Sequence, residues 1–331
     1  MSSSHREDKA SASWICQESP LPGQTEMTRI RPGREYVTVS LKYAHVANLR
    51  KGLRRFYGVV HSQVHVPGTG NPPNLEFGQL FAPPGLRGQN AKGFANLISL
   101  DRRLLGPVPY RGGALDVDLG LYSVEAENLL EPYLGVLESL SVVASGCFAG
   151  PAAVIAEPLR KGFLGLVSGR RADLLEAGLQ KSWSTPRQSL MLVMPPRPSN
   201  QDRYTVRHDG HVMDENDNLV LDRSYLVLEL RATSIREDWF DIPELVRLNE
   251  RIKDYFVERD PDGVKAAIER FQVAAIASDD LFAHDAAKIC EEVAARWAEV
   301  RLPTRNVRGA AGDPVQLPNL NEMNPFGLSV R

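Results

Sequence analysis

Two histidines and an aspartate are the best candidates for chemistry in this sequence. His208 and His211 flank an Asp-Gly pair, and Asp214 follows closely. A two-residue Asp-Gly turn would place the histidines opposite each other on a hairpin, about 5 Å apart. Imidazole nitrogens and carboxylates are common metal ligands. The pattern predicts a weak metal site and, with it, a metal-dependent hydrolase; the alternative is an exposed hairpin tip that happens to carry histidines.

Other polar clusters have simpler explanations. The run DENDN at 214–218 offers oxygens at alternate positions, as a calcium loop does, but it lacks the glycine and distal glutamate of an EF-hand and favours a polar turn. His61 and His65 are about 13 Å apart along a strand, too far to share one ion. Asp116 and Asp118 alternate with apolar residues, and no sequence feature places a partner opposite them.

The motifs that hold phosphates, zinc or activated serines are absent from the sequence. It contains no GxGxxG, GxxxxGK[ST], HExxH or GxSxG. Its three cysteines, Cys16, Cys147 and Cys290, are widely separated, and Cys147 lies between apolar stretches that favour an inert core thiol. We therefore expect no catalytic residue, no cofactor and a reducing, cytoplasmic location.

Charge excludes a global attraction to nucleic acid or anionic lipid. Thirty-nine basic residues balance 41 acidic ones, for a formal net charge of −2. The local exception is LRKGLRRF at 49–56, which as a helix would place four cations on one side and apolar residues on the other. These candidate binding residues for an acidic partner are Arg50, Lys51, Arg54 and Arg55. The alternative is a solvated basic face.

An uncharged segment, 140–156, raises the question of membrane insertion. It is marginal in length for a span and is interrupted by Pro151, which favours a buried helical hairpin. An amphipathic basic segment follows it, so residues 133–168 could instead insert after a conformational trigger, as in a pore-forming effector. The residues that would enter the membrane are Val143, Phe148, Val154, Ile155 and Phe163.

Hydrophobic periodicity predicts an α+β fold. Alternating patterns indicate strands at 36–43, 58–66, 94–100, 115–121 and 189–196, and again within 204–232. Helical patterns begin near 243, 261 and 279. Because strands flank a predicted helical segment that is capped by Ser123, we expect an antiparallel β-sandwich or curved sheet with an inserted helical hairpin and a C-terminal helical subdomain.

The same patterns suggest boundaries along the chain. Residues 1–34 read as a flexible tail; 35–235 as a β-rich domain with a helical insertion at about 124–182; 236–303 as a helical subdomain; and 304–331 as a tail or a strap. Residues 67–93, rich in Pro and Gly, read as a long loop that excludes helix and central strand. The leading functional hypothesis is a non-catalytic adaptor that binds a protein partner, or itself, through loops, tails and the basic stretch.

Overall fold

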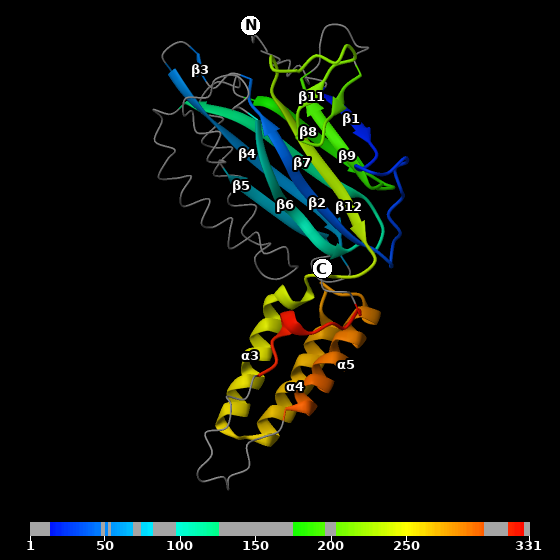
Figure 1. The fold of residues 1–331 in the computed structure, drawn as a ribbon, viewed down its shortest axis with the longest axis vertical. Helices are drawn as coiled ribbons and strands as arrows, with labels where there is room; N and C mark the ends of the chain where they lie inside the picture. The colour runs from blue at the N-terminus through cyan, green and yellow to red at the C-terminus, as the bar shows by residue number, and fades with distance from the viewer. Residues whose placement is uncertain are drawn as a thin grey trace, which may run out of the picture.

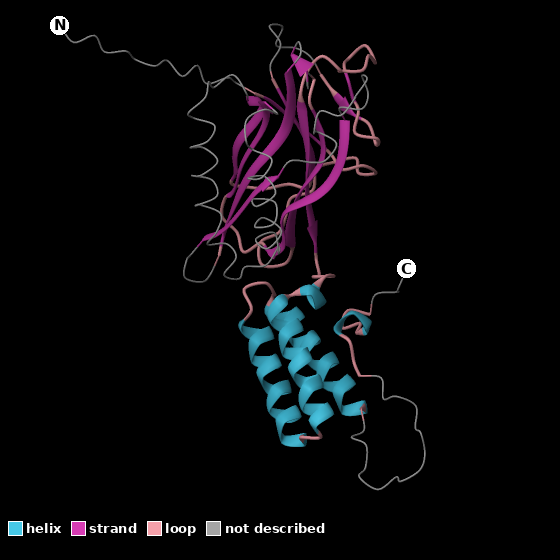
Figure 2. Ribbon diagram, turned by 90° about the vertical axis from the view of Figure 1, so that its left-hand side faces the viewer, coloured by secondary structure: helices cyan, strands magenta, loops and turns pink. Residues whose placement is uncertain are grey.

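Two antiparallel sheets face each other, and helices extend from one end of the pair (Figures 1 and 2). This computed structural model describes residues 14–47, 50–51, 54–68, 74–81, 97–125, 175–195, 203–300 and 317–327. The predicted α+β class, with antiparallel sheets and a C-terminal helical region, is confirmed.

The first sheet has the strand order β1-β9-β12-β2-β6. Its strands, in that order, are Ile15–Ser19, Ser189–Met194, Tyr225–Thr233, Tyr36–His45 and Leu97–Pro109. The central strands β9 and β12 are buried on both sides and mostly apolar: all six residues of β9 are buried, as are the first six of β12, which include Glu229. Strands with such continuous apolar runs must be covered on two faces.

The second sheet has the order β5-β4-β7-β8, and the short strand β3 pairs with the beginning of β4. In chain order these strands are Arg50–Lys51 (β3), Arg54–Pro67 (β4), Asn74–Phe81 (β5), Leu115–Glu125 (β7) and Leu175–Trp183 (β8). Alternate residues of β4 and β7, such as Val60, Val64 and Leu119, enter the core between the sheets. The intervening residues face outward, as the period of two requires.

A small meander of the chain's own residues covers the outer face of the first sheet. It contains β10 (Thr205–Val206) and β11 (Val212–Met213), and Tyr204, Val212 and Val220 pack there on Leu192 and Tyr225. The Tyr43 hydroxyl donates to the His208 carbonyl oxygen at 2.8 Å. This face of the sandwich is therefore a second apolar layer.

The helices form a bundle with its own core. Helices α3 (Pro243–Glu258), α4 (Pro261–Ala277) and α5 (Ala283–Glu299) bury Ile252, Phe271 and Trp297 between them, and the short 3₁₀ turns η4 and η5 span Trp239–Asp241 and Leu320–Glu322. The Asp260 carboxylate caps α4 by accepting from the Gly263 N–H at 3.0 Å.

A polar joint connects sandwich and bundle. The hydroxyl of Tyr36, at the start of β2, donates to Asp285 Oδ2 at 2.6 Å and accepts from the Phe282 N–H at 2.9 Å. The fully buried Arg236 donates from Nη1 to the Asp280 carbonyl oxygen at 2.8 Å. Segments far apart in sequence thus meet between the two parts.

Some predicted boundaries differ from the structure. Residues 15–34 are not a flexible tail: Ile15–Ser19 forms the edge strand β1, Leu21 is buried and Ile30 lies in the core, because β9 offers a free edge to pair with. Residues 74–81 of the predicted loop form the strand β5, because this stretch contains no proline and its one glycine, Gly78, is tolerated in a strand that pairs with β4. Ser123 is not a helix cap but a residue of β7, whose hydroxyl donates to Glu176.

The predicted insertion at 124–182 begins and ends as strand. Residues 124–125 belong to β7 and 175–182 to β8, while 126–174 lie outside the described residues. Near the C-terminus, 317–327 crosses the bundle, with Leu320 and Met323 buried in its core, so this part is a strap on the same chain. In the part of the chain that the structure describes, no helix is long and apolar enough to span a membrane.

Candidate functional site

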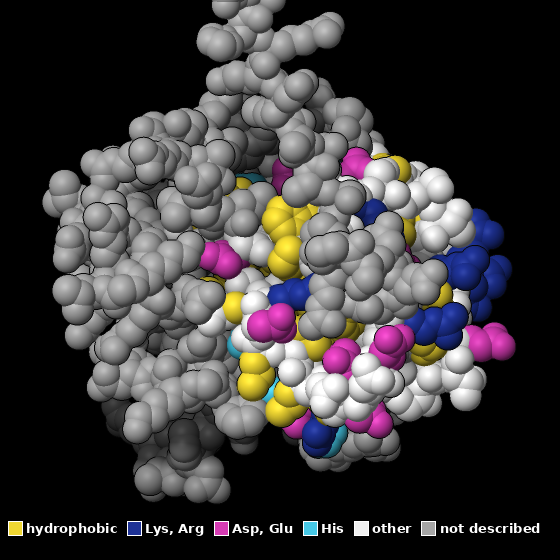
Figure 3. Space-filling model, turned by 90° about the horizontal axis from the view of Figure 1, so that it is seen from above, with side chains coloured by type: hydrophobic (Ala, Val, Ile, Leu, Met, Phe, Trp, Pro, Cys, Tyr) yellow, Lys and Arg dark blue, Asp and Glu magenta, His cyan; other side chains and the backbone are white. Residues whose placement is uncertain are grey.

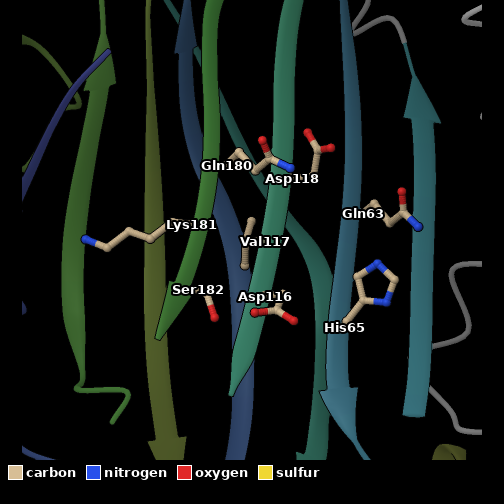
Figure 4. A pocket seen from close by; sticks show the side chains of 8 residues that line it. All are labelled: Gln63, His65, Asp116, Val117, Asp118, Gln180, Lys181 and Ser182. Atoms are coloured by element: carbon tan, nitrogen blue, oxygen red, sulfur yellow. The ribbon is translucent and has the colours of Figure 1, made fainter. Parts of the chain in front are cut away.

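Strand register assembles two rows of polar side chains on the outer face of the second sheet. In the first row His65 of β4 is opposite Asp116 of β7, which is opposite Ser182 of β8. In the second row the corresponding residues are Gln63, Asp118 and Gln180. Figure 4 shows the six side chains along three neighbouring strands, with Lys181 extending to the other side of β8.

A hollow of about 570 Å³ lies over these rows. The exposure of the lining side chains decreases from β8 to β4. Gln180 and Ser182 on β8 are exposed, Asp116 and Asp118 on β7 are half-buried, and Gln63 on β4 is buried, with 4% of its surface exposed. A ligand would therefore meet open polar groups on β8 and more enclosed ones toward β4. Enclosed groups give stronger and more selective hydrogen bonds than exposed ones.

A tyrosine on β7 lies beyond the two polar rows. The ring of Tyr122 lies over Gly120, where an added Cβ would come within 2.6 Å of Tyr122 Cε2. Gly120 is opposite His61, so the glycine leaves room for the ring in the next row. Burial, and secondarily the Asp118 carboxylate, raises the pKa of Tyr122. Its hydroxyl stays protonated at neutral pH and can donate a hydrogen bond.

The order of the strands decides what chemistry the first row can perform. It contains the residue types of a hydrolytic triad, but the aspartate is in the middle and the histidine at one end. Ser182 and His65 are two strand spacings apart, roughly 10 Å, so the imidazole cannot take the serine proton. The arrangement suits hydrogen bonding and charge recognition rather than nucleophilic catalysis.

The predicted histidine pair is not formed. The Arg207 N–H donates to the His211 carbonyl oxygen and the Gly210 N–H to the Arg207 carbonyl oxygen, so the loop has three residues, His208 to Gly210, rather than two. Gly210 has φ +86°, the left-handed position such loops require. His208 therefore lies inside the loop, and Arg207 is the residue opposite His211.

Asp214 organises a turn of its own. Its Oδ1 accepts from the backbone N–H groups of Asn216 and Asn218, both at 2.9 Å. The polar turn preferred for this run is the observed one. Among the residues that the structure describes, no three or more His, Cys, Asp or Glu side chains are grouped so as to hold a metal ion. His208, His211 and Asp214 therefore form no such group.

The basic stretch is a pair of strands, not a helix. Arg50 is opposite Arg55 and Lys51 opposite Arg54, so the four residues do not share one helical face as predicted. Figure 3 looks at the end of the sandwich away from the helices, where the coloured side chains include both basic and acidic groups. The membrane-insertion candidates Val143, Phe148, Val154, Ile155 and Phe163 lie outside the described residues.

Comparison of the chain with protein-family models, with curated proteins and with solved structures found no match. The sequence did contain a signal for the polar face, because Gln63 lies between two outward histidines and the two aspartates alternate likewise. What it lacked was the register that sets Asp116 between His65 and Ser182.

Proposed function

We propose that this chain is a non-catalytic adaptor that binds a protein segment on the outer face of β4, β7 and β8. The observation that carries the proposal is the pair of polar rows under one hollow, with two carboxylates on the middle strand. Because the strand order separates Ser182 from His65, recognition accounts for these residues better than covalent catalysis does.

The spacing of the carboxylates indicates the partner's chemistry. Asp116 and Asp118 are two residues apart on β7, so their side chains repeat at about 7 Å on one face. An extended peptide repeats its own side chains at the same interval. A segment lying along β7 with Lys or Arg at alternate positions would place one cation at each carboxylate, while the exposed Gln180 can reach its backbone.

Affinity should be modest and sensitive to salt. Half-exposed ion pairs contribute about 0.2–1 kcal/mol each, and salt screens them. Apolar and hydrogen-bonding contacts around the rows add to the binding free energy. We therefore expect dissociation constants in the micromolar range, which correspond to a binding free energy on the order of −8 kcal/mol. Free thiols at Cys16 and Cys290 fit a cytoplasmic adaptor.

Fluorescence anisotropy with designed peptides tests the proposal. The probe is an extended peptide with arginines at alternate positions, compared with a peptide of the same composition whose arginines are contiguous. We expect the alternating peptide to bind more tightly, and Asp116→Asn with Asp118→Asn to weaken its binding about tenfold. The matched control, Asp262→Asn with Glu269→Gln, removes two negative charges from exposed positions of α4.

Two results would contradict the adaptor site. Equal weakening by the α4 control would mean that only net charge attracts the peptide. Equal affinity for the two peptides would mean that the spacing on β7 is not recognised.

A further inference from the structure

One edge of the sandwich brings a thiol, an amine and a carboxylate together from two sheets. Cys16 and Glu18 are alternate residues of β1, at the edge of the first sheet. Lys181 and Trp183 are alternate residues of β8, at the edge of the second. The Lys181 side chain extends from the opposite side of β8 to Gln180 and Ser182, toward β1, although Lys181 also lines the edge of the hollow (Figure 4).

The three reactive groups are in direct contact. Lys181 Nζ lies 3.7 Å from Cys16 Sγ and forms an ion pair with Glu18 Oε1. Trp183 Nε1 donates to the same carboxylate oxygen at 3.0 Å and so holds it in place. The cluster remains accessible, since the Lys181 and Glu18 side chains are 29% and 21% exposed and Cys16 is half-buried.

The charges of the cluster set its resting state. Burial raises the pKa of Cys16, with the Lys181 ammonium opposing it. Burial alone would raise the pKa of Glu18, but hydrogen bonds from Lys181 and Trp183 hold it below its ordinary value. At rest the cluster is thus a thiol beside an ammonium–carboxylate pair, and the neighbouring cation supports the thiolate when it forms.

We propose that Cys16 and Lys181 form an oxidation-dependent covalent crosslink, a sulfur–nitrogen bond that joins the two sheets at this edge. The oxidant is a hydroperoxide such as H₂O₂. The sulfur attacks one peroxide oxygen, the O–O bond breaks, and Cys16 becomes a sulfenic acid while the second oxygen leaves as water with the thiol proton. Sulfur is oxidised by two electrons and the peroxide is reduced.

Lys181 then displaces the new hydroxyl group. A base from solvent takes a proton from the ammonium, which frees the amine lone pair to attack sulfur, while Glu18 holds the nitrogen near the sulfur. The S–N bond forms, the S–O bond breaks, and the hydroxide leaves as water with a proton from solvent. Loss of a second nitrogen proton to solvent completes the sulfenamide. Overall one thiol, one ammonium and one peroxide give the crosslink, two waters and a proton, and thiols reverse the reaction by reduction.

Mass spectrometry of the full chain before and after H₂O₂ treatment tests the crosslink. We expect the intact mass to fall by two hydrogens, and a digest to contain the peptides of Cys16 and Lys181 joined, with dithiothreitol restoring both. Since the bond closes a loop between residues 165 positions apart, we also expect Tm to rise by several degrees. Cys290, whose sulfur contacts the Gln272 carbonyl oxygen, is the internal control.

Lys181→Arg separates the crosslink from ordinary thiol oxidation. Arginine keeps the positive charge beside Glu18 but has no amine to attack sulfur, so this variant should stop at oxidised Cys16 with no joined peptide. The peptide map of the unaltered chain decides the matter even if the variant folds poorly. A Cys16 that gains oxygen without joining Lys181, a joined pair that retains oxygen, or a disulfide involving Cys16 would each overturn the sulfur–nitrogen assignment.

Discussion

The two outer faces of the sandwich are built from the same alternating geometry but carry different chemistry. On the first sheet, Leu190, Leu192 and Val227 point outward and are buried under the chain's own meander. On the second, two rows across β4, β7 and β8 consist of histidine, aspartate and serine, and of glutamine, aspartate and glutamine, in register. The first face is suited to packing and the second to recognition. Substitutions on the first face should therefore lower the free energy of unfolding, whereas substitutions on the second should weaken peptide binding.

The largest difference should come from the tyrosine at the centre of the covered face. Tyr225 is fully buried, stacks on His45 with ring centroids 4.8 Å apart and donates to the Gly210 carbonyl oxygen. We expect Tyr225→Ala to lower the free energy of unfolding by about 3–5 kcal/mol, measured by urea denaturation. Gln180→Ala on the polar face should change it by less than about 0.5 kcal/mol. Equal losses would abolish the distinction between the faces.

Alanine substitution at two glycines tests how closely the meander packs on the first sheet. At Gly210, φ is +86° and an added Cβ would lie 2.3 Å from the Tyr43 ring; at Gly23, φ is +82° with nothing within 4 Å. We expect Gly23→Ala to cost about 1 kcal/mol from backbone strain alone and Gly210→Ala about 1–2 kcal/mol more. The same urea experiment reads both. Similar losses would mean that the hairpin can lift from Tyr43 without cost.

The covered face should also make stability depend on pH. Burial lowers the pKa of His45, while its contact with the Arg223 carbonyl oxygen opposes the effect. A histidine whose pKa is lower when folded destabilises the protein as pH falls, because the unfolded chain binds the proton more readily. The loss should begin near the unfolded value of about 6.5 and level off below the folded one, with about 1.4 kcal/mol for each pKa unit between the two states.

Thermal unfolding between pH 7.5 and 5 measures this slope. His45→Asn should flatten it, whereas His65→Asn on the polar face serves as the matched removal of one histidine. If His65→Asn flattens the slope to the same extent, the pH response does not belong to the covered face.

The smallest stability effect is expected at the exposed end of the first polar row. Ser182→Ala should leave the free energy of unfolding within about 0.5 kcal/mol of the original while weakening the alternating-arginine peptide by about two- to tenfold. Loss of stability without loss of binding would assign Ser182 to structure and narrow the site to β4 and β7.

Local patterns predicted the regular elements well. The alternation in Val37, Val39 and Leu41 and the Asp260–Pro261 start signal correspond to β2 and α4. Each of these signals is local, because a period of two or a capping side chain is fixed by neighbours a few residues away. Even where the two-residue Asp-Gly turn was wrong, the hairpin itself was correctly placed, since a glycine in the left-handed region serves the three-residue loop as well.

The missed features depend on partners distant in sequence. Strand β1 has only five residues, and its order comes from pairing with β9, about 175 positions away. The polar rows likewise need the register of three strands, which no pattern within one strand specifies. The alternation around Asp116 indicates only an outward position, because nothing in the sequence places Ser182 beside it. The polar rows could therefore not be predicted from the sequence, because local patterns do not specify how distant strands pair.

The joint at Tyr36 has a consequence for dividing the protein into fragments. A cut between residues 235 and 236, where the strands end and the helices begin, would remove Asp285 and the Phe282 N–H from the Tyr36 hydroxyl. It would also leave Arg236, whose guanidinium is fully buried in the intact chain, at the new N-terminus of the helical fragment. Calorimetry should accordingly record one shared melting transition for the intact chain. Neither half should fold stably when it is produced alone, so the sandwich and the bundle form one cooperative folding unit.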